Sequence, residues 1–407
     1  MNIKEKIRNL TLENIDLSKE ITEEEILRTI DSVLMEFSKK TYIPMQDKLI
    51  LRKEILHSIH GFDVLQELIE DKDISEIMVN GSDYIFIEKE GRIYPYDKCF
   101  ESQQKLEDIV QQMVSQSNRI INEANPIVDA RLSDGSRVNI VIPPVSLDGP
   151  VITIRKFPEK PMTMNQLIQV NSISEEAATF LKQLVIAGYN IFISGGTGSG
   201  KTTFLNVLSN FIPQDERIIT IEDSAELQIR DIPNLVRLEV RNANTEGSNE
   251  ITIRDLIKTA LRMRPDRIIV GEVRDASAMD MLQALNTGHD GSLSTGHANS
   301  PRDMLSRLES LVLMGAELPL LAIRKQIASA LDIIVHLGRL RDKSRRVLSI
   351  VEVLDCKEGE IQMNPLFAFE ETGEEDGKIL GELKRENDLV KKDKLYRAGI
   401  KCEYSNS

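Results

Sequence analysis

The sequence predicts an α/β protein built on a mostly parallel sheet, preceded by a separate α+β domain and a helical N-terminal arm. Between residues 174 and about 340, runs of β-branched residues alternate with amphipathic helical segments. Such alternation is typical of a parallel sheet that helices cover on both faces. Short β-rich runs fill residues 73–156, and apolar residues at helical spacing occur in the first 70. The 407 residues are enough for two or three domains.

Five segments follow one another along the chain in this prediction. Thr22 and Glu25 have the spacing of a capping box ahead of apolar residues at helical spacing, which indicates a helix near the N-terminus. Turn sequences such as Asn80-Gly81 separate the β-rich runs, and two prolines mark a linker. The segments are a helical arm over 1–70, an α+β domain over 71–157, a linker over 158–171, the main α/β domain over 172–355, and a strand with a charged tail over 356–407.

The charge balance argues against a protein that coats nucleic acid. The 51 Lys and Arg residues are outnumbered by 65 Asp and Glu, which gives a net charge of −14, and tryptophan is absent. The three cysteines form no C-x-x-C pair, which argues against a zinc site. The first residues are charged and no apolar run is long enough to span a membrane. We therefore expect a cytoplasmic protein that meets the membrane only through partners.

A glycine-rich loop between a buried-type strand and an amphipathic helix is the strongest motif. Gly195, Gly200, Lys201 and Thr202 fit the pattern G-x-x-x-x-G-K-[ST]. The glycines let backbone N–H groups converge on a phosphate at the positive end of the helix. The lysine reaches the β- and γ-phosphates, and the Thr202 hydroxyl ligates Mg²⁺. The predicted nucleotide-binding residues of the loop are Gly195, Gly196, Thr197, Gly198, Ser199, Gly200, Lys201, Thr202 and Thr203.

Three further strand ends carry residues suited to phosphoryl transfer. Glu222 and Asp223 end one strand, and either could polarise a water or simply be a polar strand end. Glu272 ends another strand, where an acid can hold Mg²⁺ through a water. His297 follows a third strand and could sense the γ-phosphate or make a structural hydrogen bond. In open α/β sheets ligands bind at such ends, so we expect these side chains to gather there.

Arginines and one basic stretch admit both structural and functional interpretations. Five arginines crowd the strand ends and could form salt bridges or act across a subunit boundary: Arg254, Arg262, Arg264, Arg267 and Arg274. Three more in or just after the β-rich domain are candidate phosphate clamps or solvated surface residues: Arg131, Arg137 and Arg155. The stretch GRLRDKSRR, residues 338–346, is either a solvated hairpin or a face that meets a membrane partner or anionic lipid.

Three stretches resemble a family of secretion ATPases. They are TIEDSAELQ at 220–228, the long stretch over 261–312 that includes RPDRIIVGEVRD and STGHANS, and ARLSDGSRVNIVIPPVSLDGPVITIRKF at 130–157. They resemble the type II/type IV secretion ATPase superfamily, above all the CpaF-type ATPases of tight-adherence (Flp) pilus systems. The resemblance covers about residues 60–370. It implies a RecA-like P-loop ATPase core behind a PAS-like N-terminal domain, with nucleotide bound between the two domains.

The resemblance also implies roles for named residues. Glu222 would be the catalytic glutamate, and Arg137 and Arg155 would contact the phosphates. Lys201, Glu222, Glu272 and His297 would form the catalytic set, with Mg²⁺ held by Thr202 and Glu272 and with ATP as the nucleotide. The matched motifs are a Walker A motif at 195–203, an "Asp box" at 220–226, an atypical Walker B motif at 268–272 and a "His box" at 296–299.

The implied function is a hexameric motor ATPase that drives pilus assembly or protein secretion across the inner membrane. Its partners would be further copies of the chain and polytopic platform proteins of the inner membrane, with no nucleic acid. The absence of a tetracysteine zinc module favours the tight-adherence and type IV secretion branches over type II secretion. Three alternatives stay open at this point: a type IV secretion traffic ATPase, a nucleic-acid translocase, and a nucleotide-gated scaffold without turnover.

Overall fold

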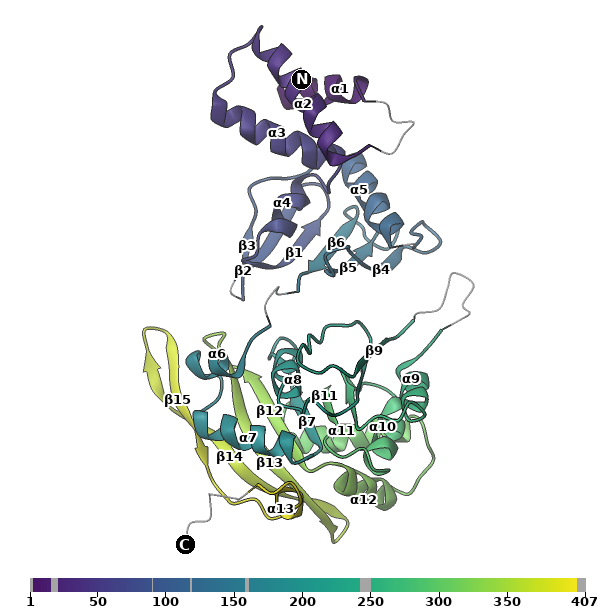
Figure 1. Ribbon diagram of the computed structural model, residues 1–407, viewed down its shortest axis with the longest axis vertical. Coiled ribbons are helices and arrows are strands. Elements are labelled where there is room, and N and C mark those ends of the chain that lie inside the picture. Colours follow the sequence, from purple (N-terminus) through teal and green to yellow (C-terminus); the bar gives the residue numbers. More distant parts are fainter. Residues whose placement is uncertain are drawn as a thin grey trace. The chain divides into compact units, whose positions relative to one another are not determined.

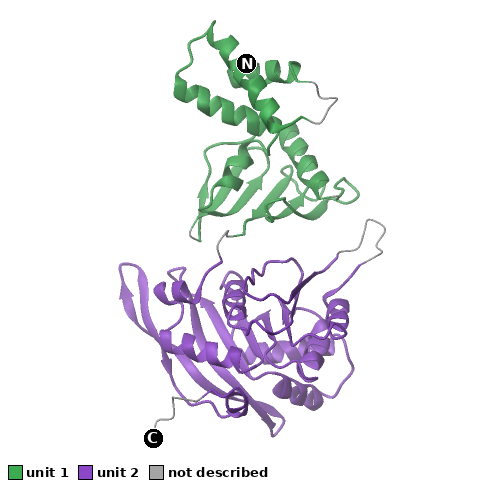
Figure 2. Cartoon of the chain, in the orientation of Figure 1, with its two compact units in different colours: residues 1–159 green, residues 160–407 purple. Residues whose placement is uncertain are grey.

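The chain folds into two compact units, Met1–Glu159 and Lys160–Ser407 (Figure 2). The computed structural model describes residues 3–15, 21–89, 91–117, 119–157, 161–241 and 250–400. Within that part, no helix is both long and apolar enough to cross a membrane.

The N-terminal arm of the first unit is a small helical bundle. Its helices are α1 (Ile3–Glu13), α2 (Glu23–Ser38) and α3 (Met45–Ile59). The capping box is confirmed, because the Glu25 amide donates to Thr22 Oγ1 and the Thr22 amide donates to the Glu25 carboxylate. The three helices share a buried apolar cluster of Ile7, Ile26, Ile30, Val33, Leu34, Ile43 and Ile55.

The rest of the first unit is an antiparallel sheet with two helices. The helices are α4 (Val64–Glu70) and α5 (Gln103–Gln116), and the strands in spatial order are β3 (Arg92–Pro95), β2 (Tyr84–Lys89), β1 (Ile74–Asn80), β6 (Val151–Arg155), β5 (Arg137–Val141) and β4 (Ile127–Arg131). The sequence predicts a helical arm that runs to residue 70. In the structure Leu65 and Leu68 of α4 instead share a core with Ile77 of the sheet, because these side chains are buried together.

The second unit is built on a nine-stranded sheet (Figure 1). Six strands are parallel, in the order β9 (Leu235–Glu239), β8 (Ile218–Glu222), β10 (Arg267–Val270), β11 (Leu293–His297), β7 (Ile191–Gly195) and β12 (Ile333–Arg339). Three antiparallel strands continue from β12: β13 (Arg345–Lys357), β14 (Glu360–Glu375) and β15 (Lys378–Arg385).

Helices bury both faces of the parallel part of this sheet. Successive residues of β7 show it, since Ile191 and Ile193 enter one apolar cluster and Phe192 enters the other. One cluster includes side chains of α7 and α8, the other those of α9 to α12. The predicted α/β class is therefore confirmed. The helices are α6 (Met164–Gln169), α7 (Glu175–Ile186), α8 (Lys201–Ser209), α9 (Ile253–Ala260), α10 (Ser277–Leu285), α11 (Pro301–Leu313), α12 (Leu320–Ala330) and α13 (Asp393–Arg397).

Two predicted boundaries differ from the structure. The segment 158–171 contains helix α6, which a capping box at Thr163 and Gln166 begins, so it is not an unstructured linker throughout. The boundary at 355/356 falls inside β13, and Leu389 and Leu395 of the expected tail are buried in the main core. The C-terminal residues up to 400 thus belong to the second unit, because their apolar side chains complete its core.

Candidate nucleotide-binding site

The glycine-rich loop joins the buried strand β7 to the first turn of α8. Gly200 is the residue before α8 and has a φ of 95°, and Gly198 has a φ of 71°. These values lie in the left-handed region that favours glycine. A Cβ on Gly195 would collide with the Leu337 carbonyl of β12 and lie 2.6 Å from Ser199 Oγ. Glycine is thus required here by both backbone conformation and space.

The loop presents its backbone to solvent beside the N-terminus of α8. Gly196, Thr197 and Gly198 are exposed, whereas Ser199 and Lys201 are buried. Ser199 Oγ donates to the Gly196 carbonyl at 2.8 Å, and Lys201 Nζ donates to the same oxygen at 2.9 Å. Exposed N–H groups at a helix N-terminus form a binding site for anions such as phosphate.

Lys201, His297 and Glu272 lie in one hydrogen-bonded line. Lys201 Nζ is 3.3 Å from His297 Nδ1, and His297 Nε2 is 3.1 Å from Glu272 Oε1. Burial and the Lys201 charge lower the pKa of His297, so the ring is neutral at pH 7. A neutral ring with its proton on Nε2 accepts from Lys201 and donates to Glu272. The structure thus brings together three of the predicted catalytic residues.

Glu222 ends β8, which pairs with β10 in parallel, so it lies near Glu272 at the same sheet edge. Its Oε2 accepts from the backbone amides of Glu226 and Leu227, at 2.7 and 2.9 Å. Burial raises the pKa of this carboxyl. Within the described residues Glu222 Oε1 is buried and has no hydrogen-bond partner. A carboxylate that is held through one oxygen and has no partner at the other can act on a water that reaches it.

The neighbouring acid, Asp223, has a different environment. Its carboxylate pairs with Arg274, and both side chains are partly exposed. Glu222 is the last residue of β8 and is buried, whereas Asp223 lies just after the strand and is partly exposed. The site therefore separates the two acids that the sequence left as alternatives.

Several of the predicted arginines have structural partners within the second unit. Arg267 is buried and pairs with Glu216 while donating to the Val185 carbonyl, and Arg254 pairs with Asp280 at 2.8 Å. Arg254, Arg267 and Arg274 thus each form a salt bridge within this chain. Arg262 and Arg264 are exposed on the segment before β10.

Three arginines of the first unit form a row across neighbouring strands. Arg131 of β4 is directly opposite Arg137 of β5, which is directly opposite Arg155 of β6. Like charges in register repel one another, so such a row is suited to an anion. The row belongs to the first unit, and a contact of Arg137 and Arg155 with nucleotide stays a prediction.

The donor set at the loop fits a Mg²⁺ ion bound together with nucleotide. In the part of the chain that the structure describes, no group of three His, Cys, Asp or Glu side chains could hold a metal alone. Mg²⁺ is commonly held by one or two protein ligands together with phosphate oxygens and waters. Thr202 in the first turn of α8 and Glu272 carry oxygen atoms that could serve as such ligands.

A residue that the sequence analysis did not single out also supports the loop. His336 of β12 is buried, and its Nδ1 lies 2.9 Å from Ser194 Oγ, just before the glycine-rich loop. It also bonds to the backbone of Asn299, at the end of the predicted "His box", and burial lowers its pKa. A histidine in mid-strand carries no motif, so only the fold reveals this contact.

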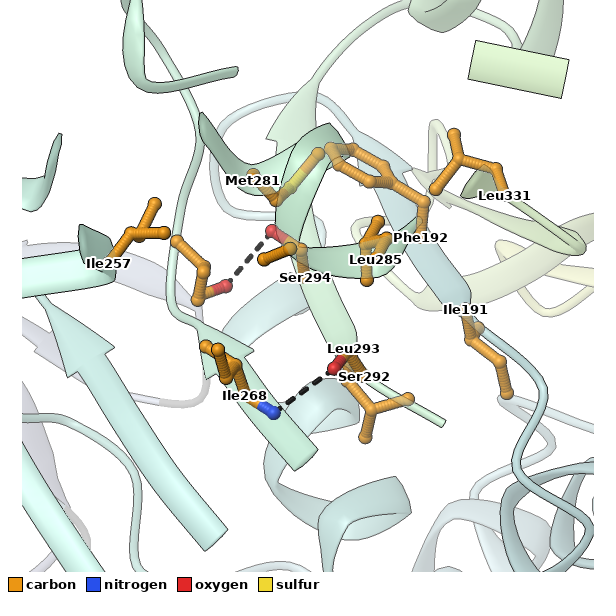
Figure 3. Close-up of a pocket in the computed structure, with 12 residues that line it drawn as sticks. Ile191, Phe192, Ile257, Ile268, Met281, Leu285, Ser292, Leu293, Ser294 and Leu331 are labelled. Carbon is orange, nitrogen blue, oxygen red and sulfur yellow. Dashed lines mark hydrogen bonds between the residues drawn. The ribbon is translucent and has the colours of Figure 1, made fainter. Parts of the chain in front are cut away.

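An internal pocket elsewhere in the unit is not part of this site (Figure 3). It lies among apolar side chains of β7, β10, β11, α9 and α10 and does not include the glycine-rich loop. Ser292 Oγ accepts from the Ile268 amide, and Ser294 Oγ donates to the Val270 carbonyl. With its polar groups satisfied, the pocket is a packing feature of the core.

Residues 59–379 match the family model described as "Type II/IV secretion system protein". The chain belongs to this family. A putative conjugal transfer protein of Mycobacterium tuberculosis (strain CDC 1551 / Oshkosh) is 34% identical over 80% of this chain and 93% of its own length. The type IV secretion system protein VirB11 of Bartonella quintana is 32% identical over 69% of this chain and 88% of its own. The predicted superfamily is therefore confirmed.

Two solved structures share the fold of this secretion-family chain. The pilus retraction motor PilT with bound ADP has a TM-score of 0.50 at 19% identity, covering 83% of this chain and 88% of its own. The ATPase DotB of Yersinia pseudotuberculosis has a TM-score of 0.52 at 19% identity, and the match covers 72% of this chain and 78% of DotB. These likenesses support the RecA-like core with an N-terminal domain.

Proposed function

We propose that this chain is a cytoplasmic motor ATPase that works as a homo-hexamer and couples Mg²⁺-dependent ATP hydrolysis to pilus assembly or protein secretion across the inner membrane. The observation that carries the proposal is the line from Lys201 through His297 to Glu272, beside an open glycine-rich loop. Family membership adds support, since the relatives with solved structures are described as ATPases or motors.

Each residue of the site has a chemical task in this proposal. The loop amides and Lys201 bind the phosphates and neutralise their charge. Glu222, fixed through Oε2, orients the attacking water through its free Oε1. Thr202 and Glu272 would hold Mg²⁺, which would neutralise phosphate charge. His297 links Lys201 to Glu272. Loss of the γ-phosphate from Lys201 would therefore also alter the hydrogen bonds of His297 and Glu272.

The motor would act through the first unit and through partners in the membrane. Arg137 and Arg155 are proposed to contact phosphate, so that nucleotide state changes the position of that unit. Such motion requires contacts that differ between the ATP and ADP states. Polytopic inner-membrane platform proteins are the proposed partners, and they would keep the chain peripheral to the membrane.

The system that the motor serves has two candidates. The motifs over 130–157, 220–228 and 261–312 support a tight-adherence (Flp) pilus ATPase of the CpaF type. The names of two relatives, a conjugal transfer protein and a type IV secretion protein, favour the type IV secretion candidate. A nucleic-acid translocase is the weaker alternative, because the chain has a net charge of −14 and no tryptophan to stack on bases.

A pull-down from native membranes tests the proposed system. Tagged Glu272→Gln would slow turnover and hold the ATP-bound state, so that partners of that state stay attached. Co-purified platform proteins of a tight-adherence pilus would support the first candidate, and type IV secretion channel components would support the second. Recovery of nucleic acid without membrane protein would contradict both.

A further inference from the structure

The hairpin between β12 and β13 lies beside the glycine-rich loop. Strand β12 pairs in parallel with β7, and Leu337 is opposite Gly195, so the chain leaves β12 at the phosphate-binding edge of the sheet. The hairpin contains the basic stretch 338–346, whose role the sequence left open.

Two of the arginines lie beside the loop. Arg339 Nη1 lies 3.8 Å from the position that a Cβ on Gly198 would occupy. Arg345 Cδ lies 3.6 Å from the corresponding position on Gly200. Gly198 and Gly200 belong to the backbone segment that forms the anion cradle. Two exposed arginine side chains of this hairpin therefore lie next to the proposed phosphate-binding loop.

The same two arginines are directly opposite each other across the hairpin. Arg339 and Arg345 are register partners of β12 and β13. Like charges in this arrangement destabilise a strand pair. Within the described residues, no carboxylate forms an ion pair with the Arg345 side chain. A bound anion between the two side chains would remove the repulsion.

The other two arginines of the stretch have different surroundings. Arg341 pairs with Glu371 and Glu374, at 2.6 and 2.8 Å. Arg346 is buried, donates to the carbonyls of Asn171 and Ile379, and lies over the Phe369 ring. The stretch is thus not a uniform basic face for a membrane. Reversing the charge of Arg346 would bury a carboxylate and disturb the fold.

We propose that Arg339 and Arg345 contact the phosphate groups of a nucleoside di- or triphosphate bound at residues 195–203. The inference rests on the proposed function, because it adds two cations to the same nucleotide site. Arginine suits the task, since its planar group donates several hydrogen bonds to phosphate oxygens. These cations come from the ATPase unit itself and add to the arginine row of the first unit.

Equilibrium binding of ADP and of adenosine to the full-length chain tests the inference. Arg339→Gln and Arg345→Gln should each raise the Kd for ADP about tenfold or more, as expected for lost hydrogen bonds to a charged group. The Kd for adenosine, which lacks phosphate, should change little. Arg341→Gln is the matched control on the same hairpin, and its ADP affinity should equal that of the wild type.

Three outcomes would overturn the inference, and they are distinguishable. Unchanged ADP affinity in both variants, with normal binding by the wild type, would remove the phosphate contact and leave the proposed function standing. Equal losses for ADP and adenosine would mean that the arginines contact the nucleoside instead. Failure of the wild-type chain to bind ADP at all would overturn the proposed function together with this inference.

Discussion

At the scale of single residues, the site depends on side chains whose charge is set by burial. His297 is kept neutral beside Lys201, and Glu222 is buried with one oxygen fixed by two backbone amides. Both conditions are needed for the proposed chemistry, because a protonated His297 could no longer accept from Lys201. Burial therefore keeps His297 able to accept from Lys201, and the two amides hold Glu222 in place, without any bound nucleotide.

His336 provides a residue-scale prediction on stability and pH. Because its pKa is lowered in the folded chain, the unfolded chain takes up a proton first as the pH falls below about 6.5. The free energy of unfolding should thus decrease from pH 7 toward the lowered pKa, and His336→Ala should weaken this dependence. The variant should also lose about 1–3 kcal/mol at pH 7, since Ser194 loses a buried partner.

Urea unfolding at several pH values measures both effects. His60→Ala is the control, because His60 is an exposed histidine and its removal should leave the pH dependence of the wild type in place. An equally steep pH dependence in His336→Ala would contradict the role assigned to the buried ring.

At the scale of elements, the C-terminal segment completes the core of the second unit. Glu352 of β13 is buried and accepts from Asn364 Nδ2 and from the amides of Val390 and Lys391. Lys394 bonds to the Gly188 carbonyl, Asp290 and Asp332. These contacts hold the segment to loops at the edge of the sheet opposite the glycine-rich loop.

Truncation tests this element directly. A chain that ends at Glu386 lacks Leu389 and Leu395, which are 2% and 1% exposed, and leaves Glu352 without two of its donors. We expect its free energy of unfolding to fall by about 3–6 kcal/mol from lost apolar burial alone. A chain that ends at Ile400 keeps these contacts and should match the full-length protein. Equal stability of both truncations would mean that the segment is a dispensable tail.

Much of the element order could be predicted from the sequence, because local patterns determine it. The glycine-rich loop and the acids at 222 and 272 each follow a short run of apolar, β-branched residues, and such a run predicts a buried strand. The segment after 355 differs from the prediction. Its many charges are typical of a solvated tail, but its few apolar residues, such as Leu389, are buried by distant elements. The contacts of His336, Arg339 and Arg345 depend on strand pairing, which no local pattern encodes.

At the scale of the whole molecule, the first unit carries a row of arginines and the second unit carries the proposed nucleotide site. The two units meet in the sequence at residue 159, and the family model spans parts of both. In the proposed motor, hydrolysis in one unit changes the phosphate contacts available to the other. The proposed motor therefore requires, before anything else, that the chain turns ATP over at the glycine-rich loop.

The most direct test is the rate at which the purified full-length chain releases phosphate from ATP in the presence of Mg²⁺. We predict turnover by the wild type and by Arg341→Gln, and a loss of about 10²-fold or more in Lys201→Ala, because a cation that stabilises the transition state is removed. A Lys201→Ala variant as fast as the wild type, or a wild-type chain without turnover, would contradict the central claim that this site drives an ATP-powered motor.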